Sequence, residues 1–197
     1  MAEEDKLDFR VTLRNSTNTR ESVTFATTPD LIEARNANYK TVDPIHAPGQ
    51  IAAYQNTSSR NFSISSIRLI SRTTIEAEAN LKTLWILRSW LMPSFGKSTK
   101  EEGRELRGSP PPVLYLTAYS KESASNQSPG HINRVPVVLQ NLSIPYPSDV
   151  DYIPTSKDRI PMPTIMTLDM TLMETHSPNE YENFSISNFR KGILRGF

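Results

Sequence analysis

The segment TIMTLDMTLMETH, from Thr164 to His176, carries the pattern that decides the fold. Every second position from 166 to 172 is apolar, namely Met166, Leu168, Met170 and Leu172. The positions between them are mostly polar, with Thr167, Asp169 and Thr171 lying between the apolar exceptions Ile165 and Met173. A period of two predicts a β-strand with one face in a core. Pro161 and Pro163 before it and Ser177-Pro178 after it mark its ends.

The same alternation predicts further strands on both sides of this segment. They are expected at Leu7–Leu13, Val23–Phe25, Ile51–Tyr54, Val113–Tyr119, Val135–Tyr146 and, briefly, Phe184–Ile186. Phe62 and Ile64 share one phase, whereas Ile67 and Leu69 share the other, so we expect a β-bulge at Ser65-Ser66. The chain is therefore predicted to be one mainly β domain over residues 1–197, with seven or eight strands.

Two segments lack strand or helix periodicity. Residues 27–50 are polar and punctuated by prolines, so we expect them to form an extended arm or a long hairpin. Segments of this length without structure of their own are usually functional. Residues 97–112 combine a dense run of both charges with Pro110-Pro111-Pro112, and they are expected to form a solvated loop.

One helix is predicted, from about Thr74 to Leu91, with Thr73 and Glu76 at capping-box spacing. One apolar stripe comprises Ala77, Leu81, Leu84, Leu87 and Leu91. A second stripe, on roughly the opposite side, comprises Ile75, Ala79, Ile86 and Trp90. A helix with two apolar sides needs cover on both, so the second stripe is a candidate subunit interface. Cover from within the chain is the alternative.

Composition excludes several functional classes. The chain has 197 residues, no cysteine and a formal net charge of +1. The near-zero charge argues against a dedicated nucleic-acid binder, and the missing thiols rule out disulfides and cysteine nucleophiles. The mean hydropathy is −0.47 and no apolar run is long enough to span a bilayer, so we expect no membrane insertion. The acidic N-terminal residues lack the pattern of a secretory signal.

No pattern in the sequence points to catalysis, a cofactor or a metal. The histidines His46, His131 and His176 lack metal-binding spacing. Asp149 and Asp151 are close together, but a solvated turn explains them better than a calcium loop. There is no glycine-rich phosphate loop and no Gly-x-Ser-x-Gly motif. By elimination we expect a binding or structural role without catalysis.

The C-terminal third resembles a known family. The motifs that carry the resemblance are IPYPSDVDYI (144–153), IPMPTIM (160–166), ETHSPNEY (174–181) and FSISNFRKG (184–192), with weaker agreement at TPDLIE (28–33) and ANY (37–39). They are similar to the tail-tube-like domain of baseplate proteins from contractile-tailed, T4-like bacteriophages, especially the tail tube initiator and cap proteins. The resemblance covers most of the chain in the order of its elements, and it is specific over about the last fifty residues.

The resemblance implies an antiparallel β-sandwich or barrel with one flanking α-helix. It implies a homohexameric ring in the virion, assembled in the host cytoplasm, which contacts the tail tube and baseplate hub while tape-measure protein and DNA pass through its lumen. Thr167, Asp169, Thr171 and Thr175 then become candidates for the lumen or the subunit interface, with a solvated outer face as the alternative.

The sequence leaves two other functions open. The chain could be the main tail tube protein or a related injection-tube ring protein. From a different class, it could be a carbohydrate-binding or carbohydrate-cleaving β-sandwich, which would require a concave site with clustered polar and aromatic residues.

Overall fold

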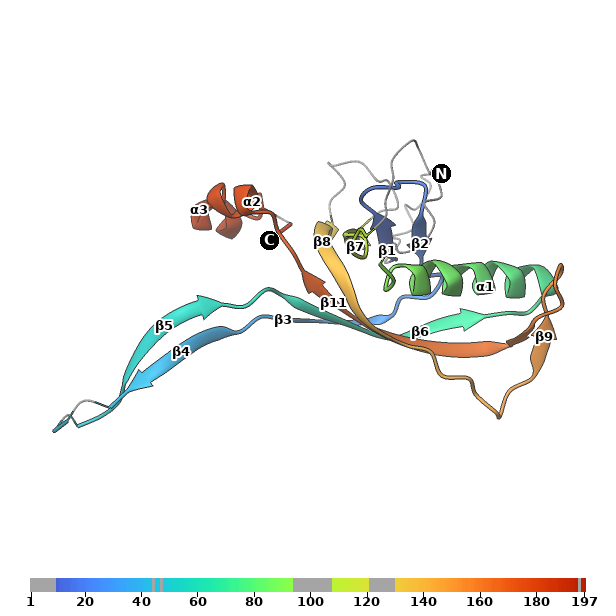
Figure 1. Cartoon of the computed structure of the whole chain (residues 1–197), viewed down its shortest axis with the longest axis horizontal. Helices are drawn as coiled ribbons and strands as arrows, with labels where there is room; N and C mark the ends of the chain where they lie inside the picture. Colours follow the sequence, from blue (N-terminus) through green and yellow to red (C-terminus); the bar gives the residue numbers. More distant parts are fainter. Residues whose placement is uncertain (1–9, 44, 47, 94–107, 121–129, 195) are drawn as a thin grey trace, which may run out of the picture.

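The computed structural model describes residues 10–43, 45–46, 48–93, 108–120, 130–194 and 196–197. Within these residues the protein is mainly β, as predicted (Figure 1). The predicted residues Leu7 and Phe9, and most of the charged loop at 97–112, lie outside the described residues.

Seven strands form one antiparallel sheet in the order β2-β1-β7-β8-β11-β6-β3. Their bounds are β1 Val11–Asn15, β2 Ser22–Thr24, β3 Asp30–Ala34, β6 Asn61–Ile70, β7 Leu114–Ser120, β8 Gly130–Ser143 and β11 Ile165–Glu174. β7 pairs with the first part of β8 as far as Val137, and β11 pairs with β8 from Val137 onward. The long strand β8 therefore joins the two halves of one continuous seven-stranded sheet.

The segment around which the fold was predicted is β11, which lies between β6 and β8. Met166, Leu168, Met170 and Leu172 are all buried, and the residues between them are exposed or half-buried. The period of two is confirmed, because one face of β11 packs in the core while the other remains open.

The predicted β-bulge is also present. Leu168 pairs with Ile67 and Met170 pairs with Ile64, so one extra residue of β6 fits between these two pairs. Ser66 absorbs the irregularity with a φ of 58°. The bulge returns Ile64 and Ile67 to the same buried face, with exposed fractions of 1% and 0%.

The arm is a two-stranded hairpin made of β4 (Ala37–Val42) and β5 (Ile51–Thr57). Figure 1 shows it extending far beyond the main sheet, as a continuation of β3 and β6. The predicted bounds, 27–50, were wrong at both ends, since residues 30–34 pair with β6 in the main sheet and the return strand runs to Thr57.

The predicted helix is α1 (Thr74–Ser89), which lies against one face of the sheet (Figure 1). The hydroxyl of Thr73 accepts a hydrogen bond from the Glu76 N–H, while the Glu76 carboxylate accepts one from the N–H of Arg72. Ala77, Leu81, Leu84 and Leu87 are buried, which confirms four of the five residues of the first stripe. Leu91 lies beyond the end of α1, where it is half-buried against the core. A small two-stranded sheet, β9 (Tyr152–Pro154) with β10 (Pro161–Pro163), packs near the helix.

The C-terminal segment differs from its prediction. The expected strand at Phe184–Ile186 is wrong, because two short helices occur instead, α2 (Pro178–Glu182) and α3 (Ile186–Arg190). Ser177 and Glu180 form a capping box, and Pro178 occupies the first turn, where its missing N–H costs nothing. The three-residue alternation was too short to distinguish a strand from a helix. The described residues contain three helices, so the expectation of a single helix is corrected.

Candidate functional site

The open face of the sheet is largely polar at its centre. Thr167 and Asp169 of β11 are exposed, and Thr171 is half-buried. Their cross-strand neighbours are also polar, namely Arg68 and Ser63 in β6 and Ser143 and Asn141 in β8. The structure therefore groups three of the predicted residues on one face. Thr175 follows the end of β11, where its N–H bonds to the carbonyl of Pro136.

Asp169 has a local structural role on this face. Its Oδ1 atom accepts a hydrogen bond of 3.1 Å from the N–H of Ser66, the residue with positive φ in the bulge. The carboxylate thus satisfies a backbone donor that the bulge removes from the ladder. The sequence placed Asp169 on the polar face but contained no sign of this contact.

Two edges of the polar half of the sheet have no strand beside them in the described part of the chain. One edge is β3, the last strand in the order. The other is the second half of β8, since β7 pairs with β8 only as far as Val137. Such edges present rows of N–H and C=O groups that can pair with another strand.

The arm is exposed on all sides. Every residue of β4 and β5 is exposed, including Tyr39 and Tyr54, whose rings pack edge to face at 5.7 Å, and the cross-strand pair Val42 and Ile51. An isolated two-stranded hairpin is marginally stable at best in water. Large apolar side chains on both faces of such a hairpin favour cover from a partner.

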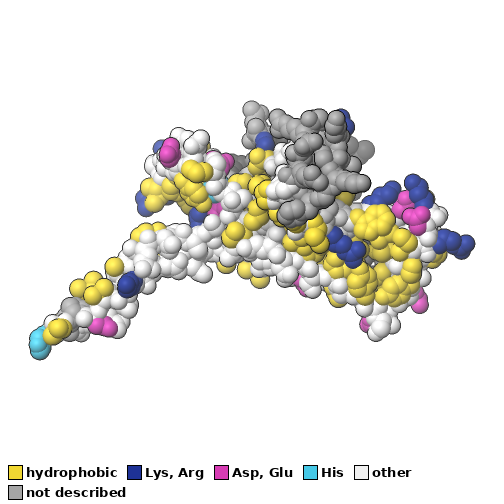
Figure 2. Space-filling model, in the orientation of Figure 1, with side chains coloured by type: hydrophobic (Ala, Val, Ile, Leu, Met, Phe, Trp, Pro, Cys, Tyr) yellow, Lys and Arg dark blue, Asp and Glu magenta, His cyan; other side chains and the backbone are white. Residues whose placement is uncertain are grey.

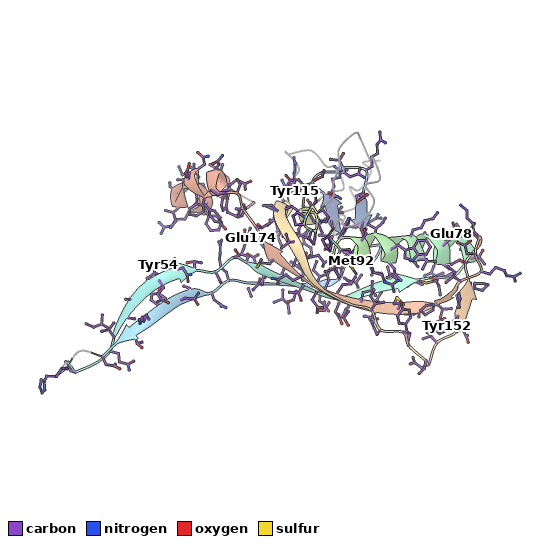
Figure 3. The ribbon with its side chains drawn as sticks, viewed as in Figure 1. Tyr54, Glu78, Met92, Tyr115, Tyr152 and Glu174 are labelled. Carbon is purple, nitrogen blue, oxygen red and sulfur yellow. The ribbon has the colours of Figure 1, made fainter. Side chains whose placement is uncertain are left out.

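A buried ionic cluster lies where the arm, the sheet and the C-terminal segment meet (Figure 3, near Glu174). The Glu174 carboxylate accepts bonds from Arg60 Nε and Nη2 at 2.9 and 2.7 Å and from Arg35 Nη2 at 3.2 Å. It also lies 2.8 Å from His176 Nε2. Arg60 further donates to the Gly196 carbonyl at 3.0 Å, so the cluster connects segments that are far apart in sequence.

Burial would raise the pKa of Glu174, but its neighbours reverse this effect. The hydrogen bonds from the Arg60 side chain and backbone, the charge of that guanidinium and the hydrogen bond from His176 hold the pKa below its ordinary value of 4.5. Glu174 is therefore an ionised, fully bonded carboxylate, which suits a structural connection.

Five apolar residues on and beside α2 and α3 form an exposed surface, which we term the C-terminal cap. They are Tyr181, Phe184, Ile186, Phe189 and Ile193, with exposed fractions between 38% and 63%. Neither short helix contributes a buried residue in the described chain. The ring of Phe197 connects the cap to the sheet. It stacks on His176 with 4.1 Å between ring centroids and also contacts Tyr181 and Phe184 of the cap.

The second stripe of α1 does not form one surface. Ile75 is 74% exposed and Ala79 is exposed, but Ile86 packs against the core and Trp90 is only 1% exposed. The prediction of Trp90 as an interface residue is therefore wrong, because its side chain lies in the core just after the last turn of α1. Its Nε1 atom lies 3.4 Å from Glu21 Oε2. Trp85 is the more exposed tryptophan, at 47%.

Sequence reasoning missed the ionic cluster and the cap. A signal for the cluster was present, because Glu174 continues the apolar phase of β11 and so places a carboxylate on the core side. Its partner Arg60 is 114 positions away and could not be assigned without the fold.

Neither a metal-binding group nor a membrane-spanning helix occurs among the described residues. No three His, Asp or Glu side chains in that part of the chain are grouped to hold a metal ion. None of its helices has the length and apolar character needed to cross a membrane.

Comparison with known proteins does not assign the chain to a family. No protein-family model matches it, and no curated protein sequence matches it significantly. Its function has to be argued from its own surfaces.

Proposed function

We propose that the protein is a structural subunit that assembles head to tail into a closed ring, as the tail tube initiators and caps of phage baseplates do. The observation that carries this proposal is the pair of open edges, β3 and the second half of β8. These edges bound the same four strands, β8-β11-β6-β3. Pairing of β3 with β8 of the next copy would close the sheet and remove both edges.

Strand direction supports this pairing. Each of the four strands is antiparallel to its neighbour, so β3 and β8 run in opposite directions. Rotation about a ring axis that runs roughly along the strands keeps these directions, and β3 of one copy would then be antiparallel to β8 of the next. The lengths agree as well, because β3 has five residues, Asp30–Ala34, and the open part of β8 runs from Val138 to Ser143.

The polar face supports a water-filled channel. Thr167, Asp169 and Thr171 with their neighbours would form the inner wall, and α1 would lie on the outer side of the ring. The formal net charge of +1 suits a conduit, because a strongly basic wall would hold DNA through counterion release. In this proposal the ring belongs to a virion baseplate and contacts the tail tube and hub, while DNA and tape-measure protein pass through it.

The proposal is tested by negative-stain microscopy and light scattering of the purified protein across a concentration series. We expect single or short stacked rings with a central hole. Long self-assembled tubes would favour a main tube subunit, and monomers at high concentration would overturn the ring.

Engineered cysteines test the edge pairing directly, since the chain has no native cysteine. Ile32 in β3 is 61% exposed and Asn141 in β8 is exposed. We expect purified Ile32→Cys and Asn141→Cys proteins, mixed and treated with a bismaleimide, to form a covalent dimer. As a control, a mixture of Ile32→Cys and Lys157→Cys proteins should form no covalent dimer, because Lys157 is exposed but lies away from both edges.

A further inference from the structure

The C-terminal cap and the start of the arm lie at the same end of the sheet. Ala34 of β3 pairs with Asn61 of β6, Asn61 pairs with Met173 of β11, and Met173 pairs with Val138 of β8. Just beyond this row the chain leaves β3 into the arm, and leaves β11 into α2. Figure 1 shows both on the same side of the molecule.

Both surfaces lack cover in the isolated subunit. Figure 2 shows hydrophobic side chains on the arm and over the C-terminal helices. Tyr39 and Tyr54 are 59% and 58% exposed, and Ile186 and Ile193 of the cap are 62% and 63% exposed. The arm and the C-terminal cap are both apolar, exposed and at the same end of the sheet. In an assembly, the cap of one subunit could therefore pack against the arm of another and bury both surfaces.

Alternation along the chain places the tyrosines toward the cap side of the sheet. Glu33 and Arg35 both bond within the ionic cluster. Side chains of an extended chain alternate between its two faces, so positions 33, 35, 37 and 39 share one face. Tyr39 and its cross-strand partner Tyr54 therefore lie on the side of the ionic cluster and the cap.

We propose that the C-terminal cap of one subunit packs on the Tyr39–Tyr54 pair of the neighbouring copy. This inference rests on the proposed ring. When β3 pairs with β8 of the next copy, the next copy's β11 is two strands away, or about 10 Å at the usual strand spacing. Its α2 and α3 then leave the sheet at the level where the first subunit's arm begins. The occupant of the arm's first half is therefore a second copy of this chain.

Cysteine cross-linking tests this contact. Ala52, on the face of Tyr54, and Ser187, beside Ile186, are both small and exposed. We expect mixed Ala52→Cys and Ser187→Cys proteins to give a covalent dimer with a bismaleimide. Ala52→Cys mixed with Ser148→Cys, on an exposed serine between β8 and β9 at the other end of the sheet, should stay uncross-linked.

Other occupants would give different products. Reaction of Ala52→Cys with itself would indicate arm-to-arm contact between stacked rings. Reaction only within a chain carrying both cysteines would indicate that a subunit's own cap covers its arm. Either result would overturn the inference. If the β3–β8 dimer forms while the arm–cap dimer does not, the ring stands and this contact alone fails.

Charge on the cap provides an independent measurement. We expect Ile186→Asp with Ile193→Asp to raise the concentration for half-assembly about 10- to 100-fold, the effect of losing a few central apolar contacts. Ile75→Asp is the matched control, because Ile75 is similarly exposed but lies on the first turn of α1, away from the arm. Equal assembly of the two variants would contradict the contact.

Discussion

Arg60 and Glu174 form a buried ion pair in which Arg60 Nε and Nη2 both donate to Glu174 Oε1, although 114 positions separate the two residues in the chain. Their side chains are 7% and 0% exposed. Two backbone hydrogen bonds also join these residues. The Arg60 N–H donates to Glu174 Oε2 at 3.0 Å, and the Glu174 N–H donates to the Arg60 carbonyl at 2.8 Å. This arrangement fixes the base of the arm against the end of β11.

Removal of one member of this pair should be strongly destabilising. We expect Glu174→Ala to lower the free energy of unfolding by about 3–5 kcal/mol, because it removes the buried partner of the Arg60 guanidinium and leaves only the exposed carboxylate of Glu33 beside it. Urea unfolding followed by circular dichroism would measure the loss. Glu182→Ala, at an exposed position of α2, is the control and should change stability by less than about 0.5 kcal/mol. A similar small change for Glu174→Ala would mean that the pair is dispensable.

The stability of the subunit should fall in acid through Glu174. Its pKa is lowered in the folded state, so its contribution is complete above the ordinary value of 4.5 and is lost as the pH falls through the lowered folded value. Thermal unfolding between pH 7 and pH 3 should therefore show a steeper decline for the native protein than for Glu174→Gln, which cannot titrate. Parallel profiles would contradict this assignment.

Trp90 should matter for folding of the single subunit. Its side chain is 1% exposed, so Trp90→Ala should cost about 3–5 kcal/mol through lost burial and a residual cavity. Ile75→Ala, at a position 74% exposed, should change monomer stability by less than about 0.5 kcal/mol. Chemical unfolding at concentrations below assembly would compare them. Equal stabilities would reject the placement of Trp90 in the core.

Asp169 should stabilise the bulge in β6. We expect Asp169→Ala to cost about 1 kcal/mol, because the N–H of Ser66 loses its acceptor. Asp169→Asn keeps an oxygen at this position and should retain most of the stability. Amide hydrogen exchange at Ser66, which should quicken only in the alanine variant, is the direct measurement. Protection that survives in Asp169→Ala would show that the side-chain contact is unimportant.

Local patterns were sufficient for the elements with sustained periodicity. The alternation from Met166 to Leu172 predicted the central strand and its buried face, and the phase change at Ser65-Ser66 predicted the bulge. Thr73 at the head of an apolar stripe predicted the start of α1. These features depend on residues close in sequence, so the period of the side chains is enough to identify them.

Local patterns failed where a short segment fits two structures. Phe184–Ile186 alternates over three residues only, and the capping residues nearby led instead to helices. The four-residue second stripe of α1 predicted one apolar face, but the end of the helix turned Trp90 into the core.

The sequence by itself determined a mainly β chain with one central half-buried strand, one long helix and an arm, because each follows from the spacing of apolar residues along the chain. Only the tertiary structure decided which strands lie at the edges, where the arm begins, and that Arg60 meets Glu174. These relationships join segments that are distant in sequence. Their geometry follows from the pairing order and register of the whole sheet, which no local period encodes.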